Sequence, residues 1–140
     1  MPKTIFINLP VSDLRRSIAF YEAIGCTRND AFSNDRAAML SWSDSIGFML
    51  MTHDMLRTFT TKSIADPSTA TLGHYALALD SREDVDRIAA AALAAGGREL
   101  HGAEDEGFMY SRAFEDPDGH AFGPFWMDAA AATAPQAEAA

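Results

Sequence analysis

The sequence predicts an α+β fold in which two βαβββ units form one domain over residues 1–128. Residues 4–53 show a strand, a helix and three short strands, and residues 73–128 repeat that order. Between them, residues 54–72 lack sustained alternation and contain Pro67 with several Ser and Thr residues, as expected of a linker. A chain of 140 residues with 48% hydrophobic content can bury one core of this size.

The first unit opens with an apolar strand at residues 4–11 and continues with a helix that is expected to end at Gly25. Ser12 is the expected N-cap, because its hydroxyl can accept a hydrogen bond from the first helical turn. Three strands are expected next, at residues 27–32, 36–42 and 46–53. A short helix is expected in the linker, at residues 55–59.

The second unit begins with a strand that starts near His74. Its helix is expected to have Asp80 as N-cap and Glu83 at the capping-box position, and to end at Gly96 and Gly97. Three strands follow, at residues 98–101, 107–115 and 120–127, with a loop between the first two. The Ala-rich tail, residues 129–140, is expected to be disordered.

Charge and composition exclude several classes of partner. Twenty acidic and eleven basic residues give a net charge of −9, and no Lys/Arg cluster could neutralise consecutive phosphates. Nucleic acid and membranes are therefore not expected as partners, and without a long apolar run we expect a cytoplasmic protein. Cys26 is the only cysteine, which rules out an internal disulfide and predicts a structural thiol.

Two stretches, VSDLRRSIAFYEAIG in the first unit and FEDPDGH in the second, give the chain a family resemblance. With the two βαβββ units, they make it resemble the vicinal oxygen chelate superfamily of glyoxalases, bleomycin-resistance proteins, fosfomycin-resistance enzymes and extradiol dioxygenases. The resemblance covers residues 4 to about 128. It implies a cupped, mostly antiparallel sheet with helices on the outside, a small-molecule cavity between the halves, and a homodimer.

The resemblance also implies where a metal would bind. Metal-dependent members place His, Glu or Gln on the first and fourth strands of each unit. The corresponding residues here are Phe6 and Met49 in the first unit, and His74 and Gly123 in the second. Of these, only His74 can bind Zn, Ni, Mn or Fe, since these ions require oxygen or imidazole ligands. We therefore expect no cofactor, with a divalent metal as the alternative.

The hairpin FEDPDGH predicts which side chains would face the cavity. Asp116 and Pro117 suit the first two positions of a type I turn, and Gly119 suits the fourth. If Glu115 and His120 close this hairpin, Arg112 lies opposite Gly123, and Tyr110 opposite Phe125.

The expected ligand-binding residues are therefore His74, Arg112, Tyr110, Gly123 and Phe125 from the second unit and Phe6, Asn8, Met49 and Met51 from the first. Each has a structural alternative: His74 as a core histidine, Arg112 in an ion pair with Glu115, Asp116 or another surface acid, Tyr110 as a packing residue, and the methionines as core. His53, His101 and His120 show no metal-site spacing.

Two main functions remain open. The first is a metal-independent binder of small molecules, similar to the bleomycin-resistance branch. The second is a metal-dependent lyase, isomerase or dioxygenase, similar to lactoylglutathione lyase, in which the ion polarises oxygens of the substrate. Metal-free acid/base catalysis and a purely structural role stay open beside them, because a fold does not select a function.

Overall fold

The structure, a computed structural model, describes residues 3–132. The first unit forms a four-stranded sheet in the order β1-β4-β3-β2, in which β1 and β4 are parallel and the other pairs are antiparallel. Its elements are β1 (Ile5–Pro10), α1 (Leu14–Ala23), β2 (Thr27–Asn29), the 3-10 helix η1 (Asp30–Phe32), β3 (Ala37–Ser43) and β4 (Ile46–Met51). The short linker helix α2 (His53–Leu56) follows, close to where the sequence predicts one.

The second unit repeats this topology with the sheet order β5-β8-β7-β6, and again the first and last strands are parallel. Its elements are β5 (His74–Ala78), α3 (Arg82–Ala94), β6 (Arg98–Asp105), β7 (Met109–Glu115) and β8 (Ala121–Met127). The two βαβββ units and the α+β class are thus confirmed, and hydrogen bonding divides the strands into two mixed sheets.

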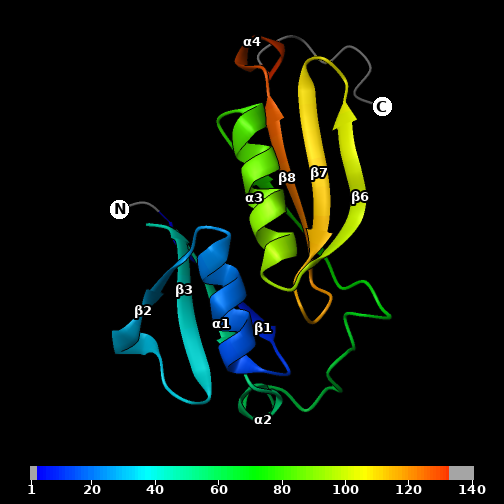
Figure 1. The fold of residues 1–140 in the computed structure, drawn as a ribbon. Helices are drawn as coiled ribbons and strands as arrows, with labels where there is room; N and C mark the ends of the chain where they lie inside the picture. The colour runs from blue at the N-terminus through cyan, green and yellow to red at the C-terminus, as the bar shows by residue number, and fades with distance from the viewer. Residues whose placement is uncertain (1–2, 133–140) are drawn as a thin grey trace.

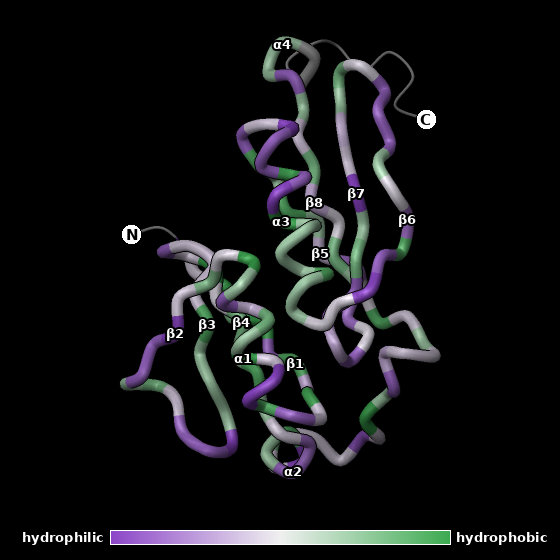
Figure 2. The backbone as a smooth tube through the Cα atoms, in the orientation of Figure 1, coloured by the Kyte–Doolittle hydropathy of each residue, from purple (hydrophilic) through white to green (hydrophobic). Residues whose placement is uncertain are grey.

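One helix lies over each sheet, α1 over the first and α3 over the second (Figure 1). Hydropathy follows this arrangement: in Figure 2 the tube is green over much of β3, which packs against α1, and purple in the turn before it. None of the helices within residues 3–132 is long and apolar enough to cross a membrane.

A single aromatic core joins the two units. Phe20 of α1 lies edge-on to Phe114 of β7, with ring centroids 6.1 Å apart. Its neighbour Tyr21 contacts Phe48 of β4 at 5.5 Å and Phe122 of β8 at 5.8 Å. The first helix therefore packs against both sheets. Such contacts between aromatic edges and faces add to the stability that burial supplies.

A buried hydrogen-bonded cluster, centred on Asp116, joins the hairpin turn of the second unit to α1. The Tyr21 hydroxyl donates to Asp116 Oδ2 at 2.8 Å. The other carboxylate oxygen, Oδ1, accepts from the backbone N–H groups of Asp118, Gly119 and His120, at 2.8 to 3.0 Å. Burial raises the pKa of the Asp116 carboxyl, and burial together with this carboxylate raises the pKa of Tyr21. The two stretches that carry the family resemblance thus contact each other.

Two further contacts strengthen this junction. Asp118 Oδ1 accepts from the backbone N–H of Ser12, just before α1, at 2.9 Å. His120 is buried, and its Nε2 lies 2.8 Å from the carbonyl oxygen of Pro10 at the end of β1. Since a carbonyl only accepts, Nε2 is the donor.

The helix caps lie one residue later than predicted. Asp13 and Ser81 are the N-caps, not Ser12 and Asp80, and each accepts from the backbone N–H three residues on, at 3.1 Å. At the first helix the reason is tertiary, because the predicted cap residue lies against Asp118 of the other unit.

Three further boundaries differ from the prediction. Of the strand predicted at residues 27–32, only Thr27–Asn29 is a strand, and Asp30–Phe32 form the 3-10 helix η1. The strand β6 runs through the stretch expected to be a loop, up to Asp105. The predicted disordered tail begins instead with a short helix, α4 (Ala129–Ala132), and the rest of that prediction lies outside the described residues. Cys26 is buried, and burial raises its pKa to about 12, as expected of a structural thiol.

Candidate functional site

The candidate site lies on the far faces of the sheets, by which we mean the faces turned away from α1 and α3. On the first sheet, Leu9, Phe48 and Leu50 point into the core between sheet and helix. Because successive side chains of a strand alternate, their neighbours point the other way. The far face of the first sheet therefore carries all four predicted residues, Phe6, Asn8, Met49 and Met51, together with Met39.

This first far face is apolar and partly exposed. Phe6 is 58% exposed, whereas Met39 and Met51 are buried. The Phe6 ring lies over Gly47, since its Cδ1 would be 3.1 Å from a Cβ at that position. Methionine side chains can adjust to irregular shapes, so this face suits an apolar ligand of variable outline.

The far face of the second sheet carries His74, Gly123 and Phe125, again as predicted. The imidazole of His74 lies directly over Gly123: its Cε1 would be 2.7 Å from a Cβ at that position. His74 is exposed, and within residues 3–132 its imidazole makes no hydrogen bond or ion pair. The space that a glycine leaves in this strand is therefore taken by an imidazole whose nitrogens are available.

The predicted placement of Tyr110 and Arg112 is wrong. Glu115 pairs with Ala121, and Tyr110 pairs with Trp126, which is one residue away from the predicted register. The hairpin closes instead between Asp116 and His120, whose backbones bond at 2.8 Å. A shift of one residue moves every side chain of a strand to the opposite face.

Both side chains consequently lie on the side of α3. The Tyr110 hydroxyl donates to Asp86 Oδ1 at 2.6 Å, and this hydrogen bond raises the pKa of the phenol. Arg112 lies 3.3 Å from the same carboxylate and 3.2 Å from Glu99. The structural alternatives therefore hold for both residues: Arg112 forms ion pairs with surface acids, and Tyr110 is a packing residue.

Other side chains of β7 lie on the far face of the second sheet, where Tyr110 and Arg112 were predicted. Ser111 pairs with Phe125, and Ala113 lies further along β7 on the same face. Glu115 also points to this side and binds Arg98 at 2.8 Å. One sequence signal could have found them: a glycine, Gly119, stands where a three-residue hairpin loop needs a left-handed residue after its type I turn. In the structure, Gly119 has this conformation, with φ of 111°.

A family model described as the Glyoxalase/Bleomycin resistance protein/Dioxygenase superfamily matches residues 5–123. The chain belongs to this superfamily. No curated protein matches the chain.

Several solved structures share the fold. A glyoxalase-related enzyme from Fulvimarina pelagi has a TM-score of 0.75 and 20% identity, over 90% of this chain and 88% of that one. A hypothetical protein from S. aureus has a TM-score of 0.76 and 22% identity, over 90% and 94%. Fosfomycin resistance protein FosX from Mesorhizobium loti has a TM-score of 0.68 and 18% identity, over 96% and 99%.

At the positions where the resemblance implies metal ligands, the residues do not fit a divalent ion. Phe6 and Met49 offer no hard or borderline donor, and at Gly123 a side chain would collide with the His74 ring. Elsewhere in the described chain, no three His, Cys, Asp or Glu side chains converge on a common point. His120 is engaged with Pro10, and His101 Nδ1 lies 2.8 Å from the carbonyl oxygen of Gly102.

Proposed function

We propose that this member of the glyoxalase superfamily binds a small molecule on its far faces without a divalent ion at the usual positions. The observation that carries the proposal is the His74 imidazole, which lies over Gly123 where metal-dependent relatives would have a carboxylate. A metal site needs several converging ligands, and one imidazole is not enough. The same imidazole can instead donate or accept a hydrogen bond to a ligand.

The ligand we propose has an apolar or aromatic body and one polar group. Phe6, Met49 and Phe125 supply apolar surface, whereas His74 and Asn8 supply hydrogen-bonding groups that are exposed on the far faces. A few polar groups in an apolar surround are typical of small-molecule sites. The proposal therefore favours binding or sequestration over metal-assisted turnover.

We also propose that the site is completed in a homodimer. Phe6 is 58% exposed in the single chain, and His74 is exposed as well. A second copy that covered these faces would bury the apolar surface and enclose a ligand between two sheets.

A binding experiment tests the role of His74. Isothermal calorimetry, or displacement of a fluorescent dye, would be run against a panel of aromatic and anionic metabolites. For the compound that binds best, His74→Ala is expected to weaken binding about tenfold, which corresponds to one lost hydrogen bond of about 1.4 kcal/mol. Gly123→Ala should weaken binding as well, because the new methyl group displaces the imidazole.

His53→Ala is the matched control, since it removes a histidine of the linker helix α2, which lies outside both sheets. Melting temperatures of all variants should stay close to that of the parent protein. Unchanged affinity in the His74 variant would contradict the proposed site, and so would an equal loss of affinity in the His53 variant.

A further inference from the structure

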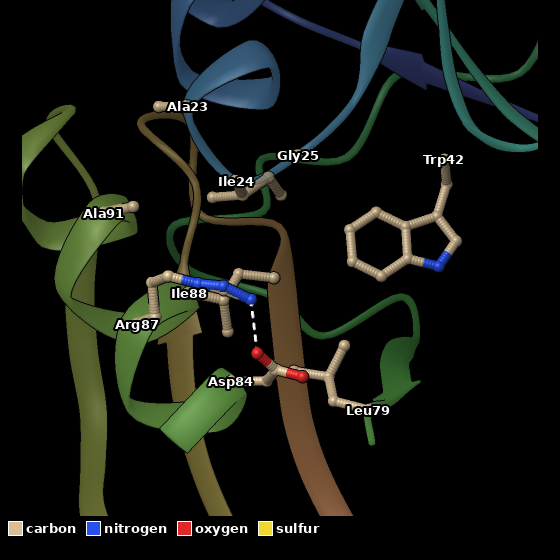
Figure 3. Close-up of a pocket in the computed structure, with 9 residues that line it drawn as sticks. All are labelled: Ala23, Ile24, Gly25, Trp42, Leu79, Asp84, Arg87, Ile88 and Ala91. Carbon is tan, nitrogen blue, oxygen red and sulfur yellow. Dashed lines mark hydrogen bonds and ion pairs between the residues drawn. The ribbon is translucent and has the colours of Figure 1, made fainter. Parts of the chain in front are cut away.

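A pocket of about 280 Å³ lies between the two units on the side of the helices. Figure 3 shows Trp42 of β3 on one side of this pocket, facing Asp84, Arg87 and Ile88 of α3 on the other. Ala23, Ile24, Gly25, Leu79 and Ala91 complete the lining. None of these residues belongs to the far faces, so the pocket is separate from the site proposed above.

The pocket has an apolar floor and one aromatic wall. Ile24 and Ile88 are buried, with 4% and 6% exposure, and both belong to the main core. Trp42 packs partly against the same core, which fixes its position. Gly25 keeps the wall open beside the indole, since a Cβ there would lie 3.7 Å from Trp42 Cζ3. The volume is at the small end of ligand pockets and suits one ring or two fused rings.

The charged groups at the rim differ in how firmly they are held. The Asp84 side chain is 32% exposed and stands in the first turn of α3, whereas Arg87, which pairs with it, is 68% exposed. An exposed ion pair of this kind contributes little to stability, so Arg87 can be replaced by another cation. The net charge of −9 favours the approach of a cation over that of an anion.

We propose that this pocket binds a planar aromatic cation. The ring would lie against the face of Trp42, which attracts cationic and aromatic groups through its π-system. The cationic group would take the place of Arg87 at the Asp84 carboxylate, in a charge-assisted hydrogen bond. Because Trp42 belongs to the first unit and Asp84 to the second, the bound ligand would also connect the two units.

Trp42 fluorescence gives a direct test. The chain has two tryptophans, so Trp126→Phe leaves Trp42 as the only one. The probes are benzamidine, its neutral isostere benzamide and the anion benzoate. We expect saturable quenching by benzamidine, with affinity about tenfold higher than for benzamide, as one charge-assisted hydrogen bond would supply. Benzoate should bind more weakly than benzamide.

Four substitutions in the Trp126→Phe background test which residues cause the preference for benzamidine. Asp84→Asn should abolish the preference, so that benzamidine and benzamide bind with about equal affinity. Arg87→Gln should raise benzamidine affinity by removing the competing guanidinium. Glu83→Gln is the matched control, because it removes a carboxylate of the same helical turn that does not line the pocket. His74→Ala should leave benzamidine binding unchanged, which separates this pocket from the far faces.

Several results would overturn the proposal. These are equal binding of the three probes, tighter binding of benzoate, an absence of saturation, or a benzamidine preference that survives in Asp84→Asn. If Asp84→Asn lowers the melting temperature, Trp42→Leu serves as the second variant. The rise in melting temperature that benzamidine causes in the parent protein must then disappear in Trp42→Leu and persist in Glu83→Gln.

Discussion

Replacing Asp116 with Ala is expected to lower the free energy of unfolding by about 3 to 4 kcal/mol. The substitution leaves the hydroxyl of Tyr21, which is 0% exposed, without its acceptor. It also removes the acceptor of the three N–H groups in the hairpin turn. Buried polar groups that lose a charged partner account for the largest costs of single substitutions. Urea unfolding at pH 7 measures the loss.

Asp44→Ala is the matched control for this experiment. Asp44 occupies the corresponding hairpin of the first unit, but it is exposed. Its replacement should change the free energy of unfolding by less than about 0.5 kcal/mol. Equal effects of the two substitutions would mean that the cluster around Asp116 does not hold the units together.

The pH dependence of Asp116 gives a second readout of the same cluster. Burial raises the pKa of this carboxyl in the folded protein, so the folded state favours its protonated form. The stability that this group contributes is present below its unfolded pKa and is lost as pH rises through the folded value. Asp116→Asn cannot titrate. The parent protein should therefore lose stability relative to this variant as pH rises above about 3.9, the pKa of an unfolded Asp, and a relative gain would contradict the assignment.

Gly97→Ala is expected to cost about 2 to 3 kcal/mol, because its methyl group has no room. A Cβ at this position would lie 2.6 Å from the carbonyl oxygen of Glu115 and 2.8 Å from that of Ala92. Both are backbone atoms, so α3 and β7 would have to move apart. Thermal and urea unfolding measure the loss.

Gly73→Ala is the matched control, since a Cβ there would meet nothing within 4 Å. Its effect should be within about 0.5 kcal/mol, or slightly stabilising through a less flexible unfolded chain. A cost at Gly97 no greater than that at Gly73 would show that α3 and β7 are not packed this closely.

The internal repeat was the most reliable guide to the site. Aligning the units predicted that Phe6 corresponds to His74 and Met49 to Gly123. The structure confirms this correspondence. In the first unit, Asn8 pairs with Met49. In the second unit, Ala76 lies 68 residues after Asn8 and pairs with Gly123, which lies 74 residues after Met49. Strand alternation then places the first-unit residues on one face without further information.

The second unit shows where sequence patterns fail. A difference of one residue in the length of the hairpin loop decides which face Arg112 occupies. Apolar periodicity does not determine this length, because β7 alternates weakly between buried and exposed residues. The length of β6 was also missed, since all eight of its residues are exposed and show no alternation. Its pairing with β7 is what defines it as a strand.

The contact between His74 and Gly123 could not be predicted either. The two residues are not direct partners, because His74 pairs with Ala121 and reaches the glycine diagonally. The sequence showed a gap in the strand and a nearby histidine. That the imidazole fills the gap follows only from the side-chain geometry.

The metal content of the purified protein distinguishes a metal-free binding site from a metal centre. The chain would be purified without chelators or added ions, and elemental analysis by mass spectrometry would quantify Zn, Ni, Mn and Fe per chain. Because three of the four usual positions are Phe6, Met49 and Gly123, we expect each metal far below one ion per chain. A stoichiometric ion that is lost in His74→Ala would contradict the proposal and favour a metal-dependent lyase, isomerase or dioxygenase.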